Sequence, residues 1–290
     1  MSDDGSQGLT VIAFIGSVFS PYYAAARRRA GTAGADPLNH CAINVALYGR
    51  NGAGWSMTER GHRRVQRDAL TLQIGTSAWR WVGDCLQIDL DEVTVPWPSR
   101  LRGRVRVHAP QRFTHAVALA PGHVWQPIAP AARVEVELGA AAAWSGSGYL
   151  DSNRGEAPLE SVFRSWDWSR AHFANGDSAV LYDVDRLDGS RHAFGLRFGA
   201  QGGVSATPPP PKAALPATRW RVPRLAESDA GYPPRLIRTL TDAPFYARSL
   251  IETQWHGERV TAFHESLSLT RFDTAWVQAM LPFRMPRRAG

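Results

Sequence analysis

Leu101-Arg102-Gly103-Arg104-Val105-Arg106-Val107 alternates aliphatic side chains with arginine, apart from Gly103. Successive side chains of an extended chain point to opposite faces, so the three arginines share one face and the aliphatic side chains share the other. This period predicts a β-strand with one face in solvent. Residues 133–138 alternate in the same way, with glutamates in place of the arginines, and predict a second strand of this kind.

Strand-like stretches recur along the whole chain and are separated by turn residues. Asp188-Gly189 joins two of them, 179–185 and 191–198, and glycine accepts the positive φ that a tight hairpin turn requires. A short helix is expected at 159–164, and residues 274–282 fit either a terminal helix or a last strand. The other expected strands cover residues 9–19, 38–48, 79–81, 86–90, 113–119, 220–222, 236–241, 245–253 and 259–269. So many short strands at even spacing predict an all-β barrel or sandwich.

The composition is that of an ordinary folded protein. With 290 residues and 44% hydrophobic content, the chain can form two modest domains or one large one. The net charge is +7, and the excess is arginine, since Lys212 is the only lysine. Such charge either keeps the surface solvated or attracts it to anionic lipid, at roughly 1 kcal/mol per basic residue near the headgroups. No helix-turn-helix, zinc-finger or RNP-like segment accompanies it, which argues against a nucleic-acid partner.

The sequence lacks the motifs that identify several common classes of enzyme. The patterns GxGxxG, P-loop, HExxH and GxSxG are absent, which argues against nucleotide enzymes, zinc proteases and serine hydrolases. The nine histidines have no spacing that requires a metal, and Cys41 and Cys85 lack CxxC spacing. We therefore expect no cofactor, no metal and a reducing compartment. The apolar run of residues 9–19 is broken by Gly16 and stopped by Pro21, so it predicts neither a signal peptide nor a membrane span of about 20 residues.

An acid, a phenol and two indoles lie close together in sequence near the middle of the chain. They belong to Tyr149-Leu150-Asp151-Ser152-Asn153-Arg154-Gly155 and Trp166-Asp167-Trp168. Asp151 has two interpretations. Short polar side chains build turns and caps. Alternatively, burial among aromatic rings raises the pKa of a carboxyl, so that it can donate its proton to an alkene, and each ring would stabilise the resulting cation by about 2 kcal/mol or more.

Other polar residues are candidates of lower rank. His123 and Trp125 lie two residues apart and share a face if the chain is extended, although His123 alone fits a hydrogen-bonded loop. Asn39 and His40 precede an expected strand, and His264, Glu265 and Ser266 interrupt an apolar one. Inward-pointing polar side chains of this kind often line a cavity, but they equally fit a solvent-facing position.

Six separated blocks of the sequence resemble, in the same order, the acyclic carotenoid 1,2-hydratases, also called hydroxyneurosporene synthases, of purple photosynthetic bacteria. The resemblance runs from the first expected strand to Leu281-Pro282-Phe283-Arg284-Met285-Pro286. The blocks are Phe14-Ile15-Gly16-Ser17-Val18-Phe19-Ser20-Pro21-Tyr22-Tyr23, Asp36-Pro37-Leu38-Asn39-His40-Cys41, Met57-Thr58-Glu59-Arg60-Gly61, Gly148-Tyr149-Leu150-Asp151-Ser152-Asn153, Trp166-Asp167-Trp168-Ser169-Arg170 and Asp242-Ala243-Pro244-Phe245-Tyr246-Ala247-Arg248-Ser249.

The resemblance implies two lipocalin-like antiparallel β-barrel domains with few short helices, residues 1–163 and 164–290. It also implies a cofactor-independent hydro-lyase that adds water across the terminal C1,C2 double bond of lycopene, giving rhodopin, or of neurosporene, giving 1-hydroxyneurosporene. The family's proposed catalytic set corresponds to the pairs His123 with Trp125 and Tyr149 with Asp151. The wider superfamily commonly has Asp-His where this chain has Asp151-Ser152, a departure that the hydratases share.

The residues and the resemblance meet in one hypothesis. Protonated Asp151 delivers its proton to C2, aromatic rings stabilise the tertiary cation at C1, and water oriented by His123, which takes a proton from it, attacks C1. Trp125 and Tyr149 complete the catalytic set. Trp166, Trp168, Asn39, His40 and His264 are expected to bind the substrate.

Two alternatives stay open from the sequence. One is a non-catalytic lipocalin-like carrier of a carotenoid or other polyprenoid, and the other is a terpenoid isomerase or cyclase that uses the same acid without water. The expected location is the cytoplasm, with peripheral contact at the cytoplasmic face of the photosynthetic membrane through arginines and the residues around Tyr22 and Tyr23.

Overall fold

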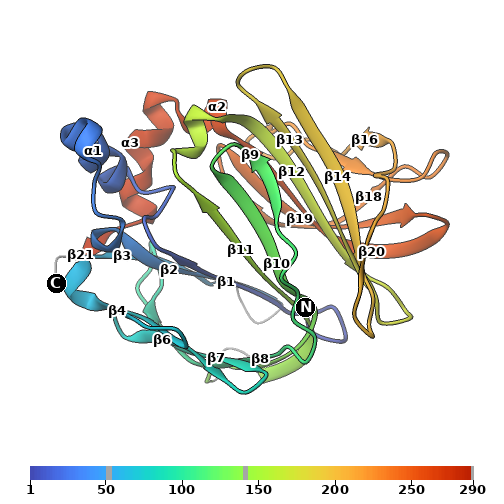
Figure 1. The fold of residues 1–290 in the computed structure, drawn as a ribbon, viewed down its shortest axis with the longest axis horizontal. Coiled ribbons are helices and arrows are strands. Elements are labelled where there is room, and N and C mark those ends of the chain that lie inside the picture. Colours follow the sequence, from blue (N-terminus) through green and yellow to red (C-terminus); the bar gives the residue numbers. More distant parts are fainter. Residues whose placement is uncertain (50–53, 140–142, 289–290) are drawn as a thin grey trace. The chain divides into compact units, whose positions relative to one another are not determined.

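The computed structural model describes residues 1–49, 54–139 and 143–288, and the main regular structure of these residues is β-strand (Figure 1). A four-stranded sheet has the order β1-β2-β3-β21, and an eight-stranded sheet has the order β11-β10-β8-β7-β6-β5-β4 with β9 beside β10. A seven-stranded sheet has the order β15-β14-β13-β12-β20-β19-β18, and β16 and β17 form a two-stranded ribbon. The all-β prediction is therefore confirmed, but the described strands form open sheets and not closed barrels.

The strands of the first two sheets are β1 (Gly8–Phe14), β2 (Cys41–Tyr48), β3 (Gly54–Arg60), β4 (Val65–Arg67), β5 (Thr71–Ile74), β6 (Ser77–Val82), β7 (Cys85–Val93), β8 (Arg100–His108), β9 (Val117–Ala120), β10 (His123–Glu137), β11 (Ala143–Gly155) and β21 (Arg287–Arg288). Those of the other two are β12 (Phe163–His172), β13 (Ser178–Arg186), β14 (Arg191–Phe198), β15 (Val204–Ala206), β16 (Lys212–Ala214), β17 (Leu225–Glu227), β18 (Arg235–Asp242), β19 (Tyr246–Trp255) and β20 (Glu258–Ser268). The helices are α1 (Pro21–Ala30), α2 (Leu269–Phe272) and α3 (Ala275–Arg284), with 3-10 turns at η1 (Gly31–Ala33), η2 (Pro37–Asn39), η3 (His62–Arg64) and η4 (Leu159–Ser161).

The chain divides into two compact units that differ from the expected domains. The first unit comprises residues 1–110, 132–148 and 278–290, and the second comprises residues 111–131 and 149–277. The expected boundary between residues 163 and 164 is not where these units divide. The reason is that the long strands β10 and β11 each contribute residues to both units, and residues 149–155 pack with strands that follow them in sequence.

Local signals in the sequence account for several elements. The hairpin at Asp188-Gly189 is confirmed, because β13 pairs with β14 and Gly189 has a φ of 85°. Residues 159–164 contain the 3-10 turn η4 and the start of β12 instead of a helix, and residues 275–282 of the expected 274–282 lie in helix α3. The expected strand at 220–222 is wrong, since this segment lies between β16 and β17 without strand pairing.

Helix α1 was not expected from the apolar period. It begins after Ser20, whose hydroxyl oxygen accepts a hydrogen bond from the backbone N–H of Tyr23 at 3.0 Å, and Pro21 occupies its first turn. Both are ordinary start signals for a helix.

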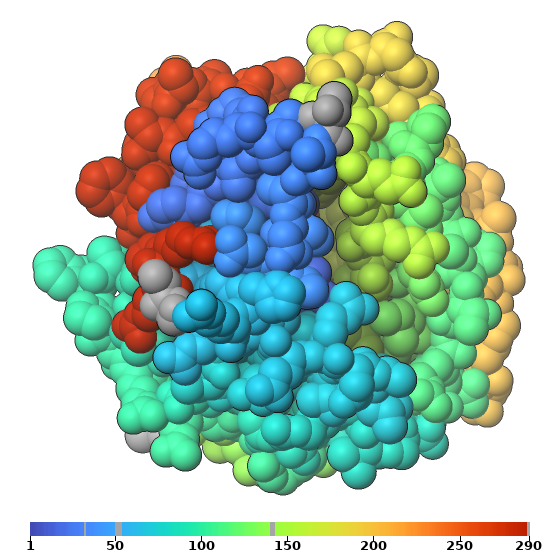
Figure 2. Space-filling view, turned by 60° about the vertical axis from the view of Figure 1, so that its left-hand side comes forward, coloured from blue at the N-terminus to red at the C-terminus, as the bar shows by residue number. Residues whose placement is uncertain are grey.

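The C-terminal strand β21 pairs with β3 in parallel, so the four-stranded sheet is not purely antiparallel as expected. The C-terminal residues, red in Figure 2, lie against the blue N-terminal segment.

The seven-stranded sheet presents two different faces within the second unit. On β12, Trp166, Trp168 and Arg170 alternate with Asp167 and Ser169, so the two sets point to opposite sides. The side of Asp167 is covered by the β16–β17 ribbon and continues into an apolar core. This core contains Phe173, Leu181, Leu215, Ile251, Trp255 and Val260. The side of Trp168 carries the aromatic residues that form the candidate site.

We expect Gly103→Ala to destabilise the first unit. A Cβ atom at Gly103 would lie 1.9 Å from the carbonyl oxygen of Glu137, so β8 could accept it only by moving away from β10. Overpacking of this kind costs about 2 kcal/mol or more in free energy of unfolding. Urea unfolding monitored by circular dichroism measures this. Gly54→Ala in β3 is the matched control, because its Cβ would meet its nearest neighbour at 3.6 Å. Equal stability of the two variants would contradict the prediction.

Candidate active site

Two strand pairs bring the predicted catalytic residues together. Trp125 lies on β10 and Tyr149 and Asp151 lie on β11, where a spacing of two residues keeps Tyr149 and Asp151 on one face. The indole N–H of Trp125 donates to Oδ2 of Asp151 at 2.9 Å, and the phenol of Tyr149 donates to the same oxygen at 2.9 Å. The indole nitrogen and the phenol oxygen are 3.2 Å apart. All three residues belong to the second unit.

The two hydrogen bonds determine where Asp151 can carry a proton. Since Oδ2 accepts both donors, the proton of the neutral acid belongs on Oδ1. Both of the side-chain donors that reach this carboxyl among the described residues bind Oδ2 and leave Oδ1. After the proton has left, the same two donors stabilise the carboxylate that remains. The group is therefore arranged to release a proton from one defined oxygen.

Burial sets the charge state of the acid and of its phenol donor. Burial raises the pKa of Asp151 to about 6, the bonds from Trp125 and Tyr149 oppose this rise, and the negative charge of Glu265 adds to it. The pKa of Tyr149 is raised well above 10, first by burial and then by the adjacent Asp151, so Tyr149 stays a neutral donor. At neutral pH a minor but usable fraction of Asp151 is protonated. An apolar substrate that displaces water would enlarge this fraction.

Aromatic rings surround the acid. The ring of Trp168 lies 5.2 Å from that of Tyr149, and Trp125 meets Tyr182 edge-on at 5.6 Å. Phe194 stacks on Tyr182 at 5.7 Å. Further rings extend the cluster: Trp166 lies 6.4 Å from Tyr182 and 5.8 Å from Phe163, and Trp125 lies 5.8 Å from Phe194. The expectation that Trp166 and Trp168 lie near the acid thus has a structural basis, and their π faces can stabilise a cation.

His123 is fixed by the backbone around it. Its Nε2 lies 3.0 Å from the carbonyl oxygen of Ala157, its Nδ1 lies 3.4 Å from that of Pro121, and the residue is 3% exposed. A Cβ atom at Gly155 would lie 2.4 Å from the imidazole, so only glycine leaves room for it. His123 therefore holds the start of β10 against the segment that follows β11, and both of its nitrogens face carbonyl oxygens.

Arg170 is a residue of this site that sequence reasoning missed. Its guanidinium carbon lies 5.8 Å from the centre of the Tyr149 ring, and its Nη2 donates to the carbonyl oxygen of Pro130 at 3.0 Å. Burial lowers its pKa to about 10, which still leaves it charged at neutral pH. The signal that could have found it is the alternation of Trp166, Trp168 and Arg170 on one face of β12.

Asn39 and His40 lie in the first unit, where among the described residues they contact Glu59 and Arg287 and not the aromatic cluster around Asp151. Nδ1 of His40 lies 2.8 Å from Oε1 of Glu59, and its ring packs on Tyr23 at 4.9 Å. Arg287 donates to Glu59 and, at 3.0 Å, to the backbone oxygen of Asn39. These contacts attach the C-terminal strand β21 to η2 and β3. The structure therefore gives Asn39 and His40 a role in holding the chain end, and their role in substrate binding stays a prediction.

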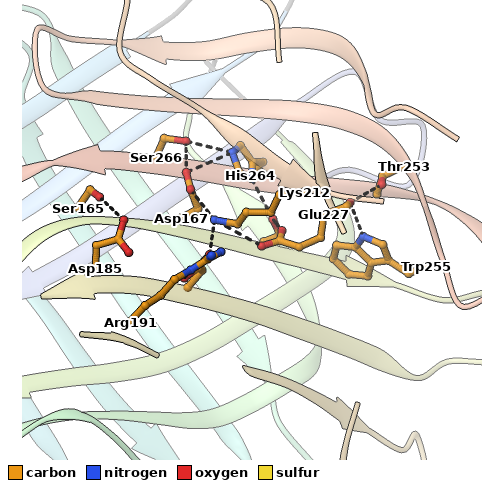
Figure 3. Close-up of polar contacts among 12 residues, drawn as sticks. Ser165, Asp167, Asp185, Arg191, Lys212, Glu227, Thr253, Trp255, His264 and Ser266 are labelled. Carbon is orange, nitrogen blue, oxygen red and sulfur yellow. Dashed lines mark hydrogen bonds and ion pairs between the residues drawn. The ribbon is translucent and has the colours of Figure 1, made fainter. Parts of the chain in front are cut away.

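His264 lies on the face of the sheet opposite Trp168, within a buried polar network (Figure 3). Its Nδ1 is 2.9 Å from the hydroxyl of Ser169 and its Nε2 is 3.0 Å from that of Ser266. Ser266 donates to Asp167 at 2.6 Å. Burial lowers the pKa of His264 to about 4, so the ring is neutral. His264 is therefore enclosed by protein. It lies on the face of the sheet opposite the aromatic cluster that surrounds Asp151.

Lys212 completes the network from the β16–β17 ribbon. Its Nζ lies 2.8 Å from Asp167, 2.5 Å from Asp183 and 3.9 Å from Glu227. Burial raises the pKa of Glu227 to about 7, and Lys212 opposes this rise. Breaking such a buried charge network by removing one partner typically costs 3–5 kcal/mol. The network therefore holds the ribbon on β12 and fixes the strand that carries Trp166 and Trp168.

We expect Asp151→Asn to change the pH dependence of stability. The folded wild type prefers the neutral acid, so its free energy of unfolding falls as pH rises from about 4 through about 6. A pKa shift of about two units corresponds to about 3 kcal/mol. Asparagine keeps an oxygen acceptor and carries no charge, so the variant should gain about 3 kcal/mol relative to wild type over this range. Urea unfolding at a series of pH values measures the difference, and a difference that does not change with pH would contradict the assignment.

The chain is similar to known proteins over its whole length. The family described as carotenoid hydratase CrtC matches residues 11–290. The acyclic carotenoid 1,2-hydratases of Thiocapsa roseopersicina and Rubrivivax gelatinosus are 54% and 48% identical to it over 294 residues, which cover 100% of this chain and 72% of theirs. That of Cereibacter sphaeroides is 40% identical and covers 97% of this chain and 99% of its own.

A solved structure supports the fold alone. A Nitrosomonas europaea protein described as an AttH superimposes with a TM-score of 0.63 at 12% sequence identity, covering 92% of this chain and 88% of its own. This confirms the lipocalin-like fold. The family resemblance of the sequence is confirmed by the relatives. The family match and these relatives show that this chain belongs to the carotenoid hydratase family.

Proposed function

We propose that this chain adds water across the terminal C1,C2 double bond of an acyclic carotenoid, lycopene or neurosporene, with Asp151 as the acid. The observation that carries this proposal is the convergence of Trp125 and Tyr149 on one oxygen of a buried carboxyl whose pKa is raised to about 6. Membership of the hydratase family supports the substrate class.

The first step is protonation of the alkene. The Oδ1–H bond of Asp151 breaks, the proton bonds to C2, and the π electrons leave C1 as a tertiary cation. Trp125 and Tyr149 then hold the carboxylate through Oδ2. The rings of Trp168 and Tyr182 lie in the same cluster and favour the cation over the neutral alkene. His123 is a positioning residue that fixes the ends of β10 and β11.

The second step is attack of water on C1, with loss of a proton from that water. Without a base, the cation would return a proton and reform the alkene. The product is a tertiary alcohol, and every atom comes from the carotenoid and one water molecule. A carrier of the same ligand would bind it without this change, and an isomerase or cyclase would change the carbon skeleton or double bonds without adding oxygen.

We expect Asp151→Asn to lose hydration by about 100-fold or more, the lower end of what general acid catalysis contributes. Wild-type protein incubated with lycopene in heavy-oxygen water should give an alcohol that carries the label, measured by mass spectrometry. Asp68→Asn is a surface control, because the hydrogen bonds that its side chain accepts from described residues are local ones, from the backbone N–H groups of Leu70 and Thr71. Near-normal labelled product from folded Asp151→Asn would contradict the assignment.

We further propose that helix α3 places the protein on an anionic bilayer surface. Trp276, Met280 and Phe283 follow the i, i+4, i+7 spacing of one helix face and are 46%, 43% and 79% exposed. Val277 and Leu281 on the other face are buried. Arg284 ends the helix and Arg288 lies on β21, and apolar residues beside basic ones are typical of interfacial helices. No helix among the described residues is long and apolar enough to cross a bilayer.

The proposed location is the cytoplasmic face of the photosynthetic membrane, where the carotenoid substrate is dissolved. The free thiols of Cys41 and Cys85 fit a reducing compartment. Tyr22 and Tyr23 are less exposed than the α3 face, and Tyr23 packs against His40 and Arg27. The exposed face of α3 is therefore the better supported site of contact with the membrane surface.

We expect Phe283→Ser combined with Trp276→Ser to abolish flotation with vesicles of phosphatidylglycerol, since about 3 kcal/mol of apolar burial would be lost. Hydration of vesicle-dissolved substrate should fall, while hydration of detergent-dissolved substrate should persist. Leu70→Ser is the matched control, because Leu70 is 61% exposed but lies outside α3. Unchanged flotation of the double variant would contradict the role of α3.

A further inference from the structure

Glu265 faces the same side of the seven-stranded sheet as the aromatic residues of the site. It lies directly opposite Trp168 of β12 and opposite Arg248 of β19 in the strand registers. Partners in an antiparallel register share a face, and their side chains are neighbours. The ring of Trp168 in turn lies 5.2 Å from that of Tyr149, whose phenol is bonded to Asp151. A second carboxylate therefore belongs to the neighbourhood of the acid.

Arg248 holds this carboxylate by one of its two oxygens. Nε and Nη2 of Arg248 each lie 2.7 Å from Oε1 of Glu265. The Arg248 side chain is 6% exposed and that of Glu265 is 21% exposed. Within the part of the chain that the structure describes, Oε2 of Glu265 has no hydrogen-bond partner. Glu265 thus mirrors Asp151, where one oxygen is held and the other is open.

The indole nitrogen of Trp168 adds an independent observation. It is buried and, among the described residues, it has no hydrogen-bond acceptor. A buried donor left unpaired costs about 1–3 kcal/mol, so such a group usually binds water or ligand. Because Trp168 and Glu265 are neighbours across the register, a water that accepts from the indole N–H can donate to Glu265.

His123, predicted from the sequence to take the proton from water, is engaged by the backbone instead. Both nitrogens of His123 face backbone carbonyl oxygens, at 3.0 and 3.4 Å. Asp151 gives up its proton in the first step, and the resulting carboxylate is held by the two donors Trp125 and Tyr149. The negative charge of Glu265 also acts on Asp151, since it raises the pKa of that acid. Two carboxyl groups of unequal environment are the usual basis for an acid and base pair.

We propose that Glu265 is the general base of the hydration, with the attacking water held between its carboxylate and the indole N–H of Trp168. This assignment rests on the proposed function. In the step, the water oxygen forms its bond to C1 of the cation, one O–H bond of that water breaks, and its proton bonds to Glu265. The proton then returns through water to Asp151, so that both carboxyl groups regain their starting states. Arg248 is the positioning residue for Glu265.

The test uses replacements that separate the base from the acid. Glu265→Gln should lower hydration by about 100-fold, within the range for a lost general base. Glu265→Ala leaves space beside the cation, and azide, an anion that needs no deprotonation, should then add to C1 and give an azido adduct seen by mass spectrometry. Asp151→Asn should form no such adduct, because without the acid there is no cation to trap.

Glu252→Gln is the matched control. Glu252 lies on β19, shares the face of Arg248 two register steps away, and pairs with Arg235 at 3.3 Å on an exposed part of the strand. The Glu252→Gln variant should hydrate the carotenoid as fast as the wild type does. Hydration by folded Glu265→Gln within about threefold of wild type would overturn the proposal, and so would a loss of hydration without an azido adduct from Glu265→Ala. Wild type that forms no labelled alcohol would instead contradict the proposed function, and the assignment of Glu265 with it.

Discussion

The convergence of two donors on Oδ2 of Asp151 is the constraint on which the rest of the site depends. Burial alone would leave an acid that keeps its proton, and hydrogen bonding alone would leave a carboxylate that has already lost it. In this protein the two effects oppose each other and leave the pKa of Asp151 at about 6. The bonds also fix the direction of proton release, because they occupy one oxygen and leave the other.

The reverse face of the sheet explains how these distances can be maintained. β12 carries Trp168 on one side and Asp167 on the other, and Asp167 is tied to Ser266 and Lys212 by short contacts. Buried ion pairs add little net stability, because desolvation offsets their attraction. They do penalise any displacement that separates the charges. The network under β12 therefore contributes order, whereas the aromatic cluster above it contributes the chemistry.

Local patterns predicted the parts of this structure that depend on neighbours in sequence. The alternation of residues 101–107 gives β8, and Asp188-Gly189 gives the β13–β14 hairpin, because period and turn residues act within a few positions. The pairs His123 with Trp125 and Tyr149 with Asp151 were identified through family resemblance and not through geometry. Pairing of β12 with β20 joins residues almost a hundred positions apart, and no local signal specifies its register. A shift of one residue would exchange Glu265 for His264 on the site face. This is why the sequence singles out His264, Glu265 and Ser266 together but does not tell which of them faces the site.

The only lysine of the chain, Lys212, is enclosed by three carboxyl groups, with its side chain 15% exposed. All other side-chain positive charge, apart from any protonated histidine, is guanidinium, which keeps its proton at neutral pH. Reagents and modifying enzymes that act on primary amines therefore have little on this surface to react with except the amino terminus. Lysine-directed cross-linking, acetylation and ubiquitin attachment would leave such a protein almost untouched, and its positive surface would persist through conditions that neutralise lysine-rich proteins.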